Sequence, residues 1–199
     1  MAGSNSSLTA LWRSLCDMKR YVPVFAIAFV LIGAVIVATS MHQYWLKEGL
    51  AVIWTDDIDA LSDEICDDAD NDKEKVQAIY HWITNNIRYD YEAEMVYQNV
   101  DISRTVETKK GICFDYATLF AALCRSQGIP CFILDGYSRD NSSYKHTWNR
   151  VYYDNRYWNL DVTYDAIQIQ ENSDVLYGFR SIGFFPWVND DEYVITRFY

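Results

Sequence analysis

The stretch that decides the fold is Lys110-Gly111-Ile112-Cys113-Phe114-Asp115-Tyr116-Ala117, which continues as Thr118-Leu119-Phe120-Ala121-Ala122-Leu123-Cys124. From Cys113 onward, its apolar residues recur at helical spacing and predict one buried stripe, made of Ala117, Phe120, Ala121 and Cys124. Gly111 and the lysines before it predict a loop. We therefore expect Cys113 in the first turn of a helix.

That position makes Cys113 a candidate nucleophile. Free N–H groups and the helix dipole favour an anion at a helix N-terminus, and a cysteine placed there gains thiolate character. Plain packing is the alternative, because free cysteines are among the most buried residues. Position alone does not decide between the two.

Two later segments favour chemistry. His146–Tyr153 alternates and is rich in β-formers, so it predicts a strand. Asp154-Asn155 predicts a tight turn, and Arg156–Thr163 predicts the partner strand. The hairpin would bring His146 close to Asp161. A thiol, an imidazole that moves its proton and a carboxylate that orients the imidazole are the parts of nucleophilic acyl transfer.

The order and separation of these motifs resemble the core of the transglutaminase-like superfamily. The matching segments are Gly111–Ala117, Gly128–Cys131, Gly136-Tyr137, His146–Asn149 and Trp158–Thr163. The resemblance implies an α+β, papain-like fold in which the nucleophile helix packs on an antiparallel sheet. It implies a catalytic triad of Cys113, His146 and Asp161. With the N-terminal segment described below, the chain resembles a membrane-anchored, bacterial-type member.

The resemblance also suggests further site residues. Papain-like enzymes use a side-chain donor upstream of the cysteine to bind the oxyanion, and Gln98 is the candidate of suitable type. The backbone N–H of Cys113 is a second donor that needs no special side chain. Trp148 is expected to wall the substrate groove or to pack under the hairpin, and Tyr116 is the other groove candidate.

The N-terminal part predicts one membrane span. Val22–Ala38 contains no charged residue and is just long enough to cross a bilayer once its flanking residues are added. Basic residues precede the run, which places the N-terminus in the cytoplasm and the rest outside. A cleaved signal peptide and a buried core helix are the alternatives. We expect a cytoplasmic segment at 1–20, a transmembrane helix at 21–40, an acidic helical linker at 41–72 and a transglutaminase-like domain at 73–199.

Composition excludes several classes of partner. The 17 basic and 28 acidic residues give a net charge of −11, which argues against nucleic acid. With three histidines and no paired CxxC motif, the sequence predicts neither a metal site nor a cofactor. Outside the predicted span, Cys66, Cys124 and Cys131 remain beside the nucleophile, and either Cys66–Cys131 or Cys124–Cys131 could form a disulfide.

The sequence thus predicts a membrane-tethered thiol enzyme that acts on peptide or side-chain amides through a thioester. A peptidase or amidase is favoured over amine transfer, since no amine site is recognisable. The alternative is a catalytically inactive transglutaminase-like module that binds a peptide or protein. A structural membrane-tethered partner of another protein is a third possibility.

Overall fold

The computed structural model describes residues 22–23, 25–35, 48–49, 52–93, 101–171, 178, 180–183 and 193–198. The chain divides into two compact units, residues 1–42 and 43–199. Each unit is described by itself. The predicted cytoplasmic segment at 1–20 lies outside the described residues.

In the first unit, residues 25–35 form a helix with exposed apolar side chains on all sides. They are Phe25, Ile27, Phe29, Val30, Leu31, Ile32 and Val35. Among the described residues, no helix has both the length and the apolarity needed to cross a membrane. The predicted span at 21–40 extends past the described part, because residues 21, 24 and 36–40 lie outside it.

The second unit mixes helices and strands. Its helices are α2 (Asp56–Ile65), α3 (Asp72–Asn86), α4 (Ile102–Thr108), α5 (Cys113–Ser126) and α6 (Val162–Gln170). Its strands are β1 (Glu48–Gly49), β2 (Val52–Ile53), β3 (Arg88–Tyr89), β4 (Lys110–Gly111), β5 (Cys131–Ser138), β6 (Lys145–Tyr153), β7 (Arg156–Leu160), β8 (Arg180–Gly183) and β9 (Tyr193–Phe198).

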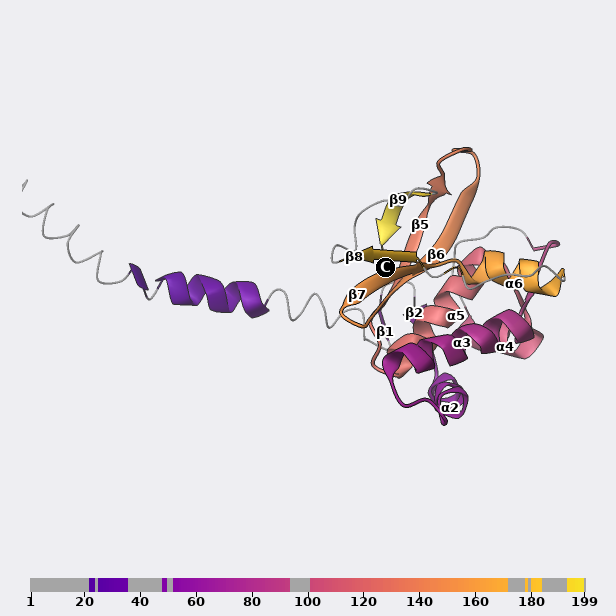
Figure 1. Ribbon diagram of the computed structural model, residues 1–199, viewed down its shortest axis with the longest axis horizontal. Helices are drawn as coiled ribbons and strands as arrows, with labels where there is room; N and C mark the ends of the chain where they lie inside the picture. The colour runs from indigo at the N-terminus through magenta and orange to yellow at the C-terminus, as the bar shows by residue number, and fades with distance from the viewer. Residues whose placement is uncertain are drawn as a thin grey trace, which may run out of the picture. The chain divides into compact units, whose positions relative to one another are not determined.

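Five strands form one antiparallel sheet in the order β8-β7-β6-β5-β9. The helices gather beside this sheet, and α5 is the helix that packs on strands β5 and β6 (Figure 1). The short pairs β1–β2 and β3–β4 lie outside the main sheet. The expected α+β core, with the helix that begins at Cys113 packed on an antiparallel sheet, is confirmed.

Helix α5 begins where the sequence predicted. The Asp115 carboxylate accepts the N–H of Ile112 at 2.8 Å and so satisfies a donor at the helix start. A Cβ on Gly111 would lie 2.7 Å from the Cβ of Asp115, so only glycine leaves room for this cap. At the other end, Gly128 has a φ of 73°, a left-handed conformation that glycine adopts without strain.

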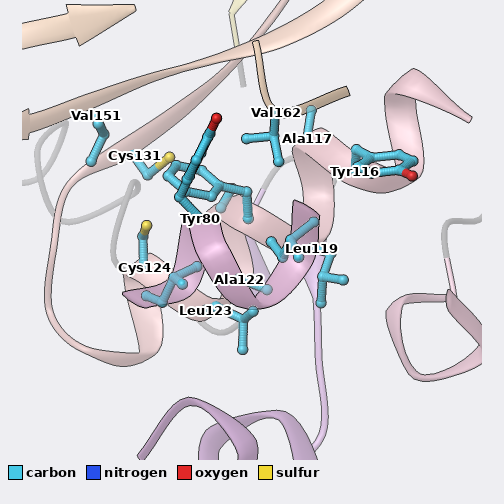
Figure 2. Close-up of a cluster of buried hydrophobic side chains, with 14 of the residues drawn as sticks. Tyr80, Tyr116, Ala117, Leu119, Ala122, Leu123, Cys124, Cys131, Val151 and Val162 are labelled. Atoms are coloured by element: carbon cyan, nitrogen blue, oxygen red, sulfur yellow. The ribbon is translucent and has the colours of Figure 1, made fainter. Parts of the chain in front are cut away.

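The centre of the core is α5 itself. Its predicted stripe is fully buried, and Leu119, Ala122 and Leu123 are buried as well, so the helix is covered on most of its circumference. Figure 2 labels five of these side chains, together with Tyr80 of α3 and with Cys131 and Val151 of the sheet. The five are Ala117, Leu119, Ala122, Leu123 and Cys124. Asn149 fixes the helix to the sheet, since its amide donates to the Ala117 carbonyl at 2.9 Å and to the Phe132 carbonyl at 3.2 Å.

The acidic stretch predicted as a helical linker contributes to this core. Its second half is α2, in which Ile58 and Ser62 are buried. The Ser62 hydroxyl donates to the Leu123 carbonyl of α5 at 2.9 Å. The helix keeps its acids in solvent and buries one apolar face, as expected for an amphipathic helix packed on a domain. Residues 48–49 and 52–53 before it are strands, where a continuous helix was expected.

The hairpin of β6 and β7 follows the prediction up to its last residues. Asp154 and Asn155 both have positive φ, as a two-residue hairpin turn requires. The second strand ends at Leu160, whereas the sequence predicted it to run to Thr163. Asp161 caps α6 by accepting the Tyr164 N–H at 3.0 Å. Its capping carboxylate begins helix α6, which takes up the last residues of the predicted strand.

Candidate active site

Cys113 is the first residue of α5 and is 3% exposed. The chain before it is fixed, because the N–H of Asp90 donates to the Gly111 carbonyl at 2.9 Å. As the first helical residue, Cys113 has no acceptor within the helix for its own N–H. That N–H is therefore suited to bind a developing oxyanion next to the sulfur, as the sequence predicted.

His146 lies near the start of β6, opposite Gly136 of β5. Its Nε2 is 2.6 Å from Oδ2 of Asp161. Because Nε2 is occupied by this carboxylate, the other ring nitrogen, Nδ1, is the one left to face a thiol. The structure thus brings His146 and Asp161 into direct contact, from the strand β6 and from the junction between β7 and α6.

The charges of this pair stabilise each other. Burial lowers the pKa of His146, but the Asp161 charge, its hydrogen bond and the interaction with Cys113 outweigh burial and raise that pKa well above its usual value. Burial alone would raise the pKa of Asp161, yet His146, the Tyr164 N–H and the Tyr193 hydroxyl together lower it. Both shifts favour the charged forms, an imidazolium beside a carboxylate.

The thiol of Cys113 interacts with the same imidazole. A hydrogen bond and a charge interaction with Cys113 both raise the pKa of His146. The three side chains come from three separate elements: the start of α5, the start of β6 and the cap of α6. Thiol, imidazole and carboxylate thus lie in the order that acyl transfer needs.

Two aromatic residues enclose the imidazole. The rings of Trp148 and His146 are stacked at 6.2 Å, and Tyr193 of β9 stacks on Trp148 at 4.5 Å. The Tyr193 hydroxyl also donates to Oδ2 of Asp161 at 2.8 Å. Sequence reasoning missed Tyr193, because no local spacing relates a C-terminal strand to Asp161.

The other predicted site residues have different positions. Tyr116, the other groove candidate, is fully buried, and its hydroxyl donates to the Ile87 carbonyl at 2.6 Å. Its hydroxyl supports the start of β3 from within the core. Trp148 lies beside the imidazole, but its side chain is only 1% exposed. Gln98, the candidate oxyanion donor, lies outside the described residues.

The other cysteines that the structure describes form no disulfide. Cys66, Cys124 and Cys131 are buried free thiols, so neither of the two candidate pairs is joined. Burial raises the pKa of the Cys124 thiol well above its usual value, and a hydrogen bond with Cys131 adds to the effect. Figure 2 shows the sulfurs of Cys124 and Cys131 in the same part of the core. These thiols behave as apolar packing residues.

Among the described residues, no group of three or more His, Cys, Asp or Glu side chains is arranged to hold a metal ion.

Known proteins resemble part of this chain. Kyphoscoliosis peptidase of Mus musculus is 32% identical over an alignment of 141 residues, and the match covers 64% of this chain and 20% of the relative. The UPF0252 protein MJ1282 of Methanocaldococcus jannaschii is 35% identical over an alignment of 111 residues, and the match covers 50% of this chain and 32% of that protein. The chain thus spans about a fifth to a third of the length of these curated relatives.

Solved structures are also similar. The periplasmic domain of TgpA from Pseudomonas aeruginosa has a TM-score of 0.46 and 21% identity, with 58% of this chain and 45% of that chain covered. A candidate cysteine protease from Cytophaga hutchinsonii has a TM-score of 0.49 and 25% identity, with 64% and 41% covered.

The family assignment rests on a family-wide sequence profile. The profile of the transglutaminase-like superfamily matches residues 59–162, more than half of the chain. The match contains Cys113, His146 and Asp161. It begins inside α2, in agreement with the packing of that helix on α5. This chain belongs to the transglutaminase-like superfamily.

Proposed function

We propose that this chain is a thiol enzyme that cleaves or transfers an amide through a Cys113-His146-Asp161 triad. The observation that carries the proposal is the buried contact of 2.6 Å between His146 and Asp161, together with the interaction of Cys113 with the same imidazole. The names of the relatives, a peptidase and a candidate cysteine protease, agree with this class of reaction.

The chemistry would proceed in two halves. The Cys113 thiolate attacks the amide carbonyl carbon, and the backbone N–H of Cys113 binds the resulting oxyanion. His146 then donates its proton to the leaving amine, the C–N bond breaks and a thioester remains. In the second half His146 takes a proton from water, the hydroxide attacks, and the thiolate leaves. An amine in place of water would give transfer. We favour hydrolysis, so the enzyme would be a peptidase or an amidase.

We further propose that residues 21–40 tether the enzyme to a membrane, with the N-terminus in the cytoplasm and the catalytic domain outside. The charge-free run Val22–Ala38 and the basic residues before it support this topology. The exposed apolar side chains of residues 25–35 agree with a lipid environment. Peptides or proteins at the cell surface would then be the substrates.

One observation favours the rival function, an inactive peptide-binding module. Cys113 and His146 are 3% and 5% exposed, so a substrate has little of either group to reach. In that case the triad would be a structural remnant in the core. The reactivity of Cys113 separates these functions, because only the enzyme needs an activated thiolate.

The test is the rate of Cys113 alkylation by iodoacetamide in the full-length chain, followed by mass spectrometry of the Cys113 peptide between pH 4 and 9. An imidazolium partner stabilises the thiolate, so alkylation should persist near pH 5. His146→Ala should lower the rate at pH 5 by at least about 10-fold. Cys66 in the same samples is the internal control, since it is buried away from His146.

Loss of reactivity at acidic pH in the wild type, or an equal rate in His146→Ala, would rule out the enzyme proposal. The binding module would then be the better description.

A further inference from the structure

We propose that Tyr193 is a positioning residue of this site: its hydroxyl holds the Asp161 carboxylate in the orientation in which that carboxylate binds His146. The inference rests on the proposed function, since it concerns the same triad. Tyr193 lies outside residues 59–162, the part matched by the family profile. The C-terminal strand β9 would thus complete the site from outside the matched part.

The hydrogen bonds of Asp161 carry the proposal. Oδ2 receives two donors, the Tyr193 hydroxyl at 2.8 Å and His146 Nε2 at 2.6 Å. Oδ1 receives the Tyr164 N–H at 3.0 Å. A carboxylate held at one oxygen can still turn about its terminal torsion, which is broad. The backbone N–H at Oδ1 and the hydroxyl at Oδ2 together fix the carboxylate plane without any help from the imidazole.

Tyr193 is itself held rigidly. Its ring stacks on Trp148 at 4.5 Å and lies 5.5 Å from the His146 ring. Trp148 also stacks on His146, so the three rings form one packed group. Each contact restricts the tyrosine hydroxyl to the direction of Asp161. A rigid donor is what a positioning role requires.

The backbone of β9 lies close against β5. Strand β9 pairs with β5 through a register shift between Asp135 and Gly136. A Cβ on Gly136 would lie 2.1 Å from the Val194 carbonyl oxygen and 2.7 Å from the Trp148 ring. Only glycine therefore permits the approach that brings Tyr193 to the site. The same glycine lies opposite His146 on β6.

The hydroxyl also affects the charge of Asp161. The groups that act on this carboxylate are His146 from β6, the Tyr164 N–H from α6 and the Tyr193 hydroxyl from β9. His146 in turn faces Cys113 of α5 and the ring of Tyr144. Removing the Tyr193 donor leaves a carboxylate that protonates more easily. At acidic pH the imidazolium would then lose its partner sooner.

The experiment uses Tyr193→Phe in the full-length chain and measures Cys113 alkylation by iodoacetamide from pH 3 to 9. The acid limb of the profile is the low-pH range in which the alkylation rate falls. In Tyr193→Phe it should move to higher pH by about one unit, because the Asp161 carboxylate loses a hydrogen bond. Asp161→Asn removes the charge on which Tyr193 acts, so Tyr193→Phe should add no further shift in that background.

Two control variants separate the hydroxyl from the strand. Thr196→Ala removes a β9 hydrogen bond to the Asp135 carbonyl, 3.0 Å long, without touching Asp161. Tyr152→Phe removes a hydroxyl from β6 away from the site. Both should keep the wild-type acid limb, and the melting temperature of each variant reports whether the fold is intact.

The proposal is overturned if Tyr193→Phe has the wild-type profile, if Thr196→Ala shifts the acid limb equally, or if the shift persists in Asp161→Asn. A wild type with no reactivity at acidic pH would overturn the proposed function instead, so the two failures differ. If Tyr193→Phe does not fold, Tyr193→Trp is the second variant, since it keeps an aromatic ring without the hydroxyl. The same shift of the acid limb would support the proposal, and a wild-type profile would overturn it.

Discussion

Asp161 has two roles: it caps a helix and it binds His146. Oδ1 caps α6 through the Tyr164 N–H, and Oδ2 holds His146. Asparagine is about as good a cap as aspartate. Replacing Asp161 with Asn therefore keeps the helix start and removes the charge. The variant isolates the electrostatic part of the contact.

This charge predicts a stability that depends on pH. The pKa of His146 is raised, so its stabilisation is full below its unfolded value of about 6.5 and is lost as the pH rises through the raised folded value. The pKa of Asp161 is lowered, so its stabilisation is present above about 3.9 and is lost as the pH falls through the lowered folded value.

We expect Asp161→Asn to lose about 1–3 kcal/mol of unfolding free energy between about pH 4 and 6.5, as for a hydrogen bond between charged groups. Thermal melts of wild type and variant should converge well above and well below this window. Asp154→Asn, in the exposed hairpin turn, is the matched control and should melt like the wild type at every pH. A difference that stays constant with pH would mean that the pair is not ionised.

At the scale of elements, the site depends on the strand pair β5–β9. Gly136 lies at the register shift, with the Val194 carbonyl and the Trp148 ring where a side chain would be. Gly128, by contrast, has a φ of 73°, and no atom lies within 4 Å of the position that a Cβ would take there. Gly136 is required because a side chain has no room there, whereas Gly128 is required because its φ is positive.

Gly136→Ala should therefore move β9 and cost about 1–3 kcal/mol or more, as overpacking does. The acid limb of Cys113 alkylation should also rise, because Tyr193 leaves Asp161. Gly128→Ala should cost about 1 kcal/mol through its positive φ and leave the alkylation profile unchanged. Equal profiles for the two variants would show that β9 does not support the site.

At the scale of the whole molecule, the chain combines an apolar first unit with an acidic second unit. Residues 43–199 contain 27 of the 28 acidic and 14 of the 17 basic residues, an excess of acid that suits a domain dispersed in water. The charge-free run Val22–Ala38 lies in the first unit, and the proposed triad lies in the second. Tethering would then restrict the enzyme to substrates near the membrane surface.

We expect the full-length chain to stay in the membrane fraction after an alkaline carbonate wash. An alkaline phosphatase reporter fused after Tyr199 should be active, since that reporter requires export. Two lysines at the middle of the run, Leu31→Lys and Ile32→Lys, should release the chain, because each costs about 2.5–3.5 kcal/mol at the centre of a span. Arg13→Lys keeps the basic flank and is the control. A wild type that is released by the wash would contradict the tether.

Local pattern was enough for much of the fold. Helical spacing placed α5 with Cys113 as its first residue, and alternation with a two-residue turn placed the β6–β7 hairpin. These elements depend on contacts within a few residues. The end of β7 was missed because the Asp161 carboxylate, a single side chain, turns the chain into a helix.

By itself the sequence determined the start of the helix at Cys113 and the nearness of His146 and Asp161, because the first follows from periodicity and the second from one hairpin. The class of the core followed from the resemblance of its motifs to a known family. Only the tertiary structure decided which residues complete the site. Tyr116 became a core residue through a bond to Ile87, and Tyr193 reached Asp161 through the pairing of β9 with β5. Contacts between distant segments depend on the register and close packing of whole elements, which no local spacing encodes.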